Sequence, residues 1–305
     1  MKPISMSFCI NDKYAQHLAV VLTSILVNNP EEDFIFHVLH SNVTDESITR
    51  VKELEKMYPR NRIVFHHVDP SRFSSFKIPV QLEHVSVETY YRYLLPELLL
   101  DEDRTIYSDV DVLCQRSLDG LWNYDLKGNL LGAVRNYEAE SRGYREQILA
   151  KFGFSASSPY FFTGFLVMDL KALRAGGYVR SLVDRTCADG AKLPFIDLDV
   201  VNLVCEGRIL EMSEEWNCTS RYRPWKANVR IWHFLGWTQK PWCNIWKNIT
   251  WIPYLRYLRK SPYADKVWSL IWGHIKGFFY FRYEKKGVTR HLVCGIRVWR
   301  SKARG

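Results

Sequence analysis

Alternating strand-like and helix-like segments constrain the fold of this chain more than any other feature of its sequence. Short apolar segments typical of strands lie at residues 5–10, 34–39 and 62–68, and they are separated by helix-length segments at 14–28 and 44–57. Helical crossovers between successive strands favour a parallel sheet with right-handed β-α-β connections. We therefore expect an α/β fold whose first strands run parallel.

The second helix has a recognisable start. Thr44 is a residue type favoured at the N-cap, and Ser47 stands at the third helical position, where Glu or Gln is more usual. Beyond a loop expected at residues 69–84, the sequence predicts the following elements: a helix at 88–100 broken near Pro96, strands at 105–113, 130–134 and 160–170, a helix at 171–187 interrupted near Gly176, a helix beginning at Asp197, and a late strand at 230–234.

Two aspartates one residue apart, Asp109 and Asp111, end an apolar strand-like run. Buried carboxylates without partners are costly, so we expect both at the carboxyl end of a strand, where open α/β sheets bind ligands. Alternation turns the two side chains to the same side and Val110 to the other. Hard oxygen donors suit Mg²⁺ or Mn²⁺, particularly when substrate phosphates complete the coordination. The alternative is a pair of solvated aspartates in a turn.

A histidine leaving the late strand and a loop after it complete this group. His233 could join the two carboxylates as a manganese ligand. Lys240, four residues beyond Gly236, could meet a phosphate. Together these residues indicate a metal-bound diphosphate, although a structural histidine and a solvated lysine are alternatives.

Basic charge is concentrated at one end of the chain. The 305 residues contain 42 Lys/Arg and 33 Asp/Glu, of which 14 and 2 lie in residues 243–305, so that segment carries a net +12 and residues 1–242 carry −3. This asymmetry favours a polyanionic partner for the C-terminal segment. We expect residues 1–242 to form the catalytic domain and residues 243–305 a small helical region.

Tryptophan and tyrosine accompany the basic residues of this C-terminal region. Such rings favour the headgroup level of a bilayer, and Lys and Arg are attracted to anionic lipid. We expect residues 267–281 to lie on an anionic membrane surface, which disfavours nucleic acid as the partner. The alternative is an ordinary basic helical subdomain packed against the rest of the protein.

Cysteine usage bears on the compartment. The seven cysteines are scattered and form no Cys-x-x-Cys pair, which indicates reduced thiols rather than a disulfide framework or a zinc site. The N-terminus leads directly into a strand-like run without a signal-peptide pattern. We expect a cytoplasmic protein attached to the inner face of the plasma membrane.

Several segments occur together in a characteristic order. They lie at residues 8–14, 36–39, 84–92, 107–113, 197–202 and 233–242. In this combination the chain resembles the retaining nucleotide-sugar glycosyltransferases of family 8, the class that contains bacterial lipooligosaccharide galactosyl- and glucosyltransferases and glycogenin. The resemblance covers about residues 5–242.

The resemblance implies a GT-A fold, a UDP-hexose donor and Mn²⁺ or Mg²⁺ bound by Asp109, Asp111 and His233. It implies a lipid-linked oligosaccharide acceptor, such as a lipopolysaccharide core or capsule precursor. The donor contacts that it implies are Cys9, Asn11, Tyr14, Arg92, Asp109, Val110, Gly236 and Lys240. It implies catalytic roles for Asp197, Arg92 and Lys240, and it places His84, Thr163 and Gly164 near the acceptor or the donor sugar.

Four positions depart from the family's usual pattern. Asn11 stands where an acidic residue is usual, and Lys13 where a small polar residue is frequent. Phe162 replaces an amide that would contact the donor sugar, and Leu198 replaces a frequent glutamine near its reacting face. The metal and phosphate positions match the family while the positions that contact the sugar differ, so we expect a donor other than UDP-galactose, or one bound in a different orientation.

Retention of configuration could proceed through a covalent intermediate or through attack from the leaving-group face. Leu198 cannot act as a nucleophile, which favours the second route, with Asp197 as the carboxylate available for the first.

Two other functions fit parts of the sequence. A nucleotidyltransferase also uses paired aspartates and a metal, but residues 9–12 lack the Gly/Arg/Lys-rich turn that it would prefer. A non-catalytic sugar- or nucleotide-binding protein would be consistent with Phe162 and Leu198.

Overall fold

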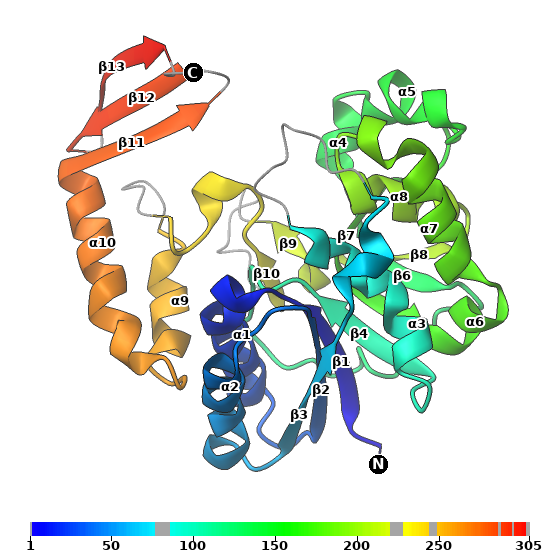
Figure 1. The fold of residues 1–305 in the computed structure, drawn as a ribbon, viewed down its shortest axis with the longest axis horizontal. Coiled ribbons are helices and arrows are strands. Elements are labelled where there is room, and N and C mark those ends of the chain that lie inside the picture. The colour runs from blue at the N-terminus through cyan, green and yellow to red at the C-terminus, as the bar shows by residue number, and fades with distance from the viewer. Residues whose placement is uncertain are drawn as a thin grey trace.

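The computed structural model describes residues 2–76, 86–219, 228–243, 249–285, 288–294 and 296–302. A central sheet and its flanking helices form the body of the molecule, and the C-terminal helix α10 with three further strands lies to one side of it (Figure 1). The last described strand, β13, is far from the first strand, β1 (Figure 1).

The main sheet has seven strands within the described residues, in the order β3-β2-β1-β4-β7-β6-β8. The strands are β1 (Ile4–Cys9), β2 (Phe34–His40), β3 (Asn61–His67), β4 (Arg104–Ser108), β6 (Leu131–Arg135), β7 (Phe161–Asp169) and β8 (Ile209–Met212). β1 lies parallel to both β2 and β4, β2 to β3, and β6 to β8, whereas β7 runs antiparallel between β4 and β6. The expected mostly parallel α/β sheet is confirmed.

Helices cover both faces of this sheet. The α-helices are α1 (Ala15–Asn28), α2 (Asp45–Met57), α3 (Leu95–Leu98), α4 (Tyr137–Ser141), α5 (Tyr144–Gln147), α6 (Leu170–Ala175), α7 (Tyr178–Asp189), α8 (Ile196–Val204), α9 (Trp251–Leu258) and α10 (Val267–Phe279). The 3₁₀ helices are Asp12–Tyr14, Pro70–Phe73, Val87–Leu94, Leu149–Phe152, Gly190–Lys192, Glu214–Trp216, Trp237–Gln239 and Ala264–Lys266. Neighbouring strand residues face different cores, since Ile106 packs with α1 and α2 while Tyr107 packs with α7 and α8. Thr44 caps α2 as expected, accepting from the Ser47 amide at 3.3 Å.

The predicted strand at residues 105–113 is two strands in different sheets. β4 ends at Ser108, and β5 (Val112–Cys114) belongs to a three-stranded sheet with β10 (Ile231–His233) and β9 (Cys218–Thr219). The two aspartates lie in the crossing between these sheets. A local apolar pattern cannot show this division, because it depends on pairing with residues more than a hundred positions away.

The predicted helix at residues 88–100 is also different in the structure. Most of it is the 3₁₀ helix Val87–Leu94, and the α-helical turn α3 begins only at Leu95. Pro96 lies in the first turn of α3, where its missing N–H costs least.

The predicted interruption near Gly176 is confirmed, since α6 and α7 are separated there and Gly177 has a φ of +65°.

The C-terminal region is only partly helical, which corrects the expectation of a helical appendage. After α10 come three antiparallel strands, β11 (Tyr280–Lys285), β12 (Val288–Val293) and β13 (Ile296–Lys302). α9 packs against α1 and contributes Tyr254 and Tyr257, both fully buried, to the same core as the main sheet. The hydrophobic core beside the main sheet therefore includes residues beyond position 242. Among the described residues, no helix is both long and apolar enough to cross a membrane.

Candidate active site

Three side chains from two separate parts of the chain meet beyond the end of β4. Antiparallel pairing sets His233 opposite Val112, and the Phe234 amide donates to the Asp111 carbonyl at 2.9 Å. This pairing brings His233 beside Asp109 and Asp111, with one potential ligand atom of each residue within 4.8 Å of the others. The metal-ligand residues predicted from the sequence are thus brought together.

The imidazole of His233 is held from both of its nitrogen atoms. Nε2 lies 3.3 Å from Asp111 Oδ1, and Nδ1 lies 2.9 Å from Asn217 Oδ1. The side chain is only 3% exposed, and burial lowers the pKa of His233 to about 4, with Asp109 acting in the opposite direction. A buried neutral imidazole is the form that can ligate a metal.

Gly164 leaves the space in which these ligands meet. A Cβ at this position would lie 2.4 Å from His233 Cε1 and 2.6 Å from Asp109 Oδ2. The Asp109 amide donates to the Gly164 carbonyl at 2.7 Å, so the glycine also fixes the backbone of the first aspartate. Two carboxylates and an imidazole around a space without side-chain atoms from β7 fit Mn²⁺ or Mg²⁺.

Arg92 links the elements around this cluster. Its guanidinium donates to the Thr163 carbonyl at 2.8 Å and to Asp109 Oδ1 at 3.1 Å, and it lies over the Tyr107 ring at 4.3 Å. The Tyr107 hydroxyl donates to the same Asp109 oxygen at 2.7 Å. Arg92 and Tyr107 both bind Oδ1 and together fix the Asp109 carboxylate. Among the described residues no hydrogen bond to its Oδ2 is seen, so this oxygen can reach a ligand.

Asp197 lies on the other side of Arg92, in the first turn of α8. Its carboxylate is 3.4 Å from Arg92 Nε and accepts a hydrogen bond from the Thr89 hydroxyl at 3.1 Å. Burial raises the pKa of Asp197 to about 6, although Arg92 beside it lowers that pKa. Both carboxylate oxygens therefore already have partners among the described residues.

Lys240 reaches the cluster from the loop that follows β10. Its Nζ donates to Asp111 Oδ2, and burial lowers the pKa of Lys240 to about 8, against the effect of Asp109. The loop turns at Gly236, whose φ of +76° is readily adopted by glycine. This loop thus adds one ammonium group to the cluster of candidate metal ligands.

The remaining sequence candidates lie around the same strand ends. Cys9 ends β1, and burial raises the pKa of its thiol. Asn11 donates to the Ser86 hydroxyl at 3.3 Å, and the Tyr14 ring packs edge-on against Trp242. The side chain of Val110, which lies between the two aspartates in the sequence, is buried.

His84 lies outside the described residues, whereas Phe162 and Leu198, the two departures at positions that contact the sugar in the family, lie inside. The Phe162 side chain is buried with the core that contains α1, and the backbone of Thr163 accepts from Arg92 as described above. Leu198, on α8, packs against the opposite core. Neither side chain offers a polar atom where the family usually has an amide.

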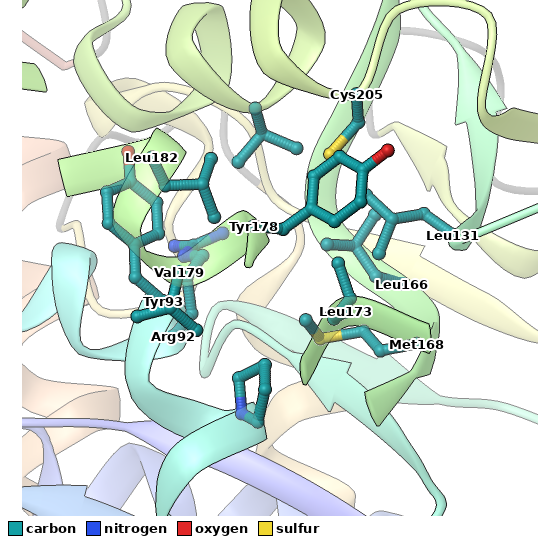
Figure 2. A pocket seen from close by; sticks show the side chains of 12 residues that line it. Arg92, Tyr93, Leu131, Leu166, Met168, Leu173, Tyr178, Val179, Leu182 and Cys205 are labelled. Carbon is teal, nitrogen blue, oxygen red and sulfur yellow. The ribbon is translucent and has the colours of Figure 1, made fainter. Parts of the chain in front are cut away.

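A small cavity lies beside Arg92, and no carboxylate is among the side chains that line it (Figure 2). Its volume is about 20 Å³, and leucine, valine, methionine and tyrosine side chains from β7, α6 and α7 line it. Sites for small molecules are typically on the order of 300 Å³ or larger. This cavity is therefore a packing gap, and the cluster of Asp109, Asp111 and His233 remains the candidate site.

Three residues of the site were not found from the sequence. Asn217 contacts His233, Tyr107 contacts Asp109, and Trp242 stacks on His17 with ring centroids 3.6 Å apart. Tyr107 and Asp109 are two residues apart, so their side chains point to the same side of an extended strand, and this spacing could have suggested the position of Tyr107. No local sequence signal marks Asn217, because its role depends on the pairing of β9 with β10.

Comparisons with known proteins identify the family to which the chain is similar. The model of the family described as glycosyl transferase family 8 matches residues 5–245. A relative from Haemophilus influenzae is 27% identical over 218 residues, covering 71% of this chain and 63% of the relative, so the chain spans less than two thirds of that protein's length. General stress protein A of Bacillus subtilis is 24% identical and covers 82% of this chain and 91% of its own length.

Two further matches carry more specific names. Lipopolysaccharide 1,3-galactosyltransferase of Salmonella typhimurium is 23% identical over 78% of this chain and 72% of that protein. Among solved structures, the galactosyltransferase LgtC in complex with donor and acceptor sugar analogues has a TM-score of 0.72 at 25% identity, covering 84% of this chain and 95% of that one.

Proposed function

The chain belongs to glycosyl transferase family 8 and has the GT-A fold of LgtC, and from this we propose that it transfers a hexose from a UDP-sugar to a lipid-linked glycan with retention of configuration. The observation that carries the proposal is the cluster of Asp109, Asp111 and His233 around Gly164. Mn²⁺ or Mg²⁺ held there would stabilise the negative charge that develops on the leaving diphosphate, which is usually the largest catalytic effect.

Residues of the chain assist the departure of UDP. Lys240 lies close enough to the cluster to neutralise the diphosphate, and we assign Gly236, whose φ of +76° turns the same loop, to a backbone contact with the diphosphate. We assign to the nucleoside Cys9 at the end of β1, Asn11 and Tyr14 in the segment that follows it, and Val110 just after β4. Arg92 holds Asp109 in a fixed orientation, so the carboxylate needs no rearrangement during the reaction.

The surroundings of Asp197 favour attack from the leaving-group face. A carboxylate nucleophile would have to leave Arg92 and Thr89 to reach an anomeric carbon. In the route that we favour, the acceptor hydroxyl attacks as the sugar–phosphate bond breaks, and its proton passes to the departing diphosphate oxygen. Asp197 then holds Arg92 and the donor sugar in position, and we assign Thr163, Gly164 and His84 to contacts with the sugar or the acceptor.

The donor is proposed to be a UDP-hexose other than UDP-galactose, because Phe162 and Leu198 replace polar groups with apolar ones. The test is a panel of UDP-sugars incubated with Mn²⁺ and without acceptor, with UDP release as the measurement. The proposal requires release from at least one UDP-hexose, and UDP-galactose must not be the best donor. Complete inactivity towards every UDP-sugar would contradict the proposed UDP-sugar donor. Release from UDP-galactose well above all others would contradict the proposed donor preference.

The acceptor is proposed to be a lipopolysaccharide core or capsule precursor at the cytoplasmic membrane surface. Support comes from α10, whose outward residues recur at helical spacing: Trp268 is 69% exposed, Trp272 56%, Ile275 40% and Phe279 61%. The opposite side of α10 is anchored, since His274 lies 2.9 Å from the Pro241 carbonyl, next to Lys240. An apolar stripe beside basic charge suits a helix lying on anionic lipid.

This attachment can be tested without removing the buried residues of α9. Trp268→Ser combined with Trp272→Ser should reduce flotation with phosphatidylglycerol vesicles at least several-fold while leaving donor hydrolysis unchanged. Leu100→Ser is the matched control, because Leu100 is 70% exposed on the body of the protein. Equal flotation of the double variant and the wild type would contradict the membrane proposal.

A further inference from the structure

Asn217 lies next to His233 because of how two strands pair. It immediately precedes β9, and the parallel pairing of β9 with β10 sets Thr219 beside His233. The Asn217 side chain is 1% exposed, and its Oδ1 lies 2.9 Å from His233 Nδ1. The contact therefore joins two buried groups that are fixed by the backbone.

The turn that holds Asn217 is itself well fixed. The backbone N–H of Asn217 donates to the Glu214 carbonyl at 3.2 Å, and the backbone N–H of Arg230 donates to the Glu215 carbonyl at 2.9 Å. The Arg230 guanidinium also lies over the ring of buried Trp216, at 5.0 Å. A side chain on such a turn can hold a partner in one orientation.

The chemistry of imidazole makes this orientation important. A histidine that ligates a metal through Nε2 must carry its proton on Nδ1, and a hydrogen bond from Nδ1 selects that tautomer. The amide oxygen of Asn217 is placed to accept that hydrogen bond, while Nε2 faces Asp111 at 3.3 Å. The absence of a side chain at Gly164 leaves room for the ring at its Cε1 side.

We propose that Asn217 is a positioning residue that fixes the tautomer and ring orientation of His233 for metal binding. The inference rests on the metal role of His233 in the proposed function. Asn217 itself touches neither metal nor donor, and it acts only through His233. Loss of such a hydrogen-bond partner typically weakens metal affinity about 10–100-fold.

The experiment is calorimetric titration of the full chain with Mn²⁺ alone. Asn217→Leu should weaken Mn²⁺ binding at least about 10-fold, whereas Asn217→Asp, which keeps an acceptor oxygen, should stay within a few-fold of wild type. Thr219→Val is the matched control. Thr219 lies in β9, two residues after Asn217, and is similarly buried, but its hydroxyl makes no hydrogen bond to a candidate metal ligand among the described residues. It should leave Mn²⁺ affinity unchanged.

A second measurement separates positioning from a loss of folding. Nitrogen-15 shifts of labelled histidine should report the Nδ1–H tautomer of His233 in the wild type and in Asn217→Asp, and a mixture or the other tautomer in Asn217→Leu, with thermal melting measured for each variant. The proposal is overturned if Asn217→Leu binds Mn²⁺ as tightly as wild type, or if Asn217→Asp is as weak as Asn217→Leu. Wild type that binds Mn²⁺ but hydrolyses no UDP-sugar would refute the proposed function and leave this assignment standing.

Discussion

Gly164→Ala is the substitution whose effect the structure specifies most closely. The new methyl carbon would lie 2.4 Å from His233 Cε1 and 2.6 Å from Asp109 Oδ2. Unstrained contacts between carbon atoms lie at about 3.5–4.0 Å, so the ligands would have to move apart by roughly 1 Å. Metal–ligand distances tolerate only about 0.2 Å. The strand cannot easily retreat, because the Gly164 carbonyl accepts from the Asp109 amide at 2.7 Å.

We therefore expect Gly164→Ala to weaken Mn²⁺ binding by at least about 100-fold and to reduce UDP release by a similar factor. The assays are calorimetric titration with Mn²⁺ and UDP release from the best donor. Gly132→Ala in β6 is the matched control. A Cβ there would meet Leu126 Cδ2 at 2.9 Å and Met212 Sδ at 3.0 Å, both at the ends of flexible apolar side chains. It should lower the stability by about 1–3 kcal/mol and leave Mn²⁺ affinity unchanged.

The reasoning is refuted if Gly164→Ala retains wild-type Mn²⁺ affinity, or if Gly132→Ala weakens that affinity as much as Gly164→Ala does.

Arg92→Lys should reduce UDP release at least about 10-fold, because one ammonium group cannot replace the contacts of the guanidinium with both Thr163 and Asp109; wild-type rates would contradict this. Asp197→Asn should leave measurable transfer and form no covalent glycosyl-enzyme in mass spectra, and detection of a sugar adduct on Asp197 in the wild type would support the double-displacement route instead. Burial, with His66 and Arg62 nearby, lowers the pKa of His37 to about 4. Below about pH 6.5 the unfolded chain therefore binds a proton at His37 that the folded protein excludes. The free energy of unfolding is unaffected by His37 above that pH and is lower by roughly 2 kcal/mol at pH 5. His37→Gln should lessen this loss in urea titrations at pH 7 and 5, and an identical loss in both proteins would contradict it.

The sequence predicted the parts of the fold that depend on local patterns. The first three strands, α1, α2 and the interruption at Gly176 follow from apolar periodicity and capping residues, which act within a few positions. Asp109, Asp111 and His233 were also predicted, because carboxylates that end a buried strand need a partner such as a cation, and because the segments match a known family.

The remainder depends on long-range pairing. The division of residues 105–113 between β4 and β5 is set by β10, more than a hundred residues later. Asn217 reaches His233 only through the β9–β10 pairing. The strands β11 to β13 were not predicted because their mixture of basic and aromatic residues also suits a membrane-associated helix.

The central claim is that sugar transfer depends on a metal held by Asp109, Asp111 and His233. The most direct measurement is UDP release from the best donor by wild type and by Asp111→Asn, each in Mn²⁺ and in excess chelator. We predict that chelator abolishes release by wild type and that Asp111→Asn in Mn²⁺ is slower by at least about 100-fold with an unchanged melting temperature. Release by wild type that persists in chelator, or near-normal release by Asp111→Asn, would contradict the account.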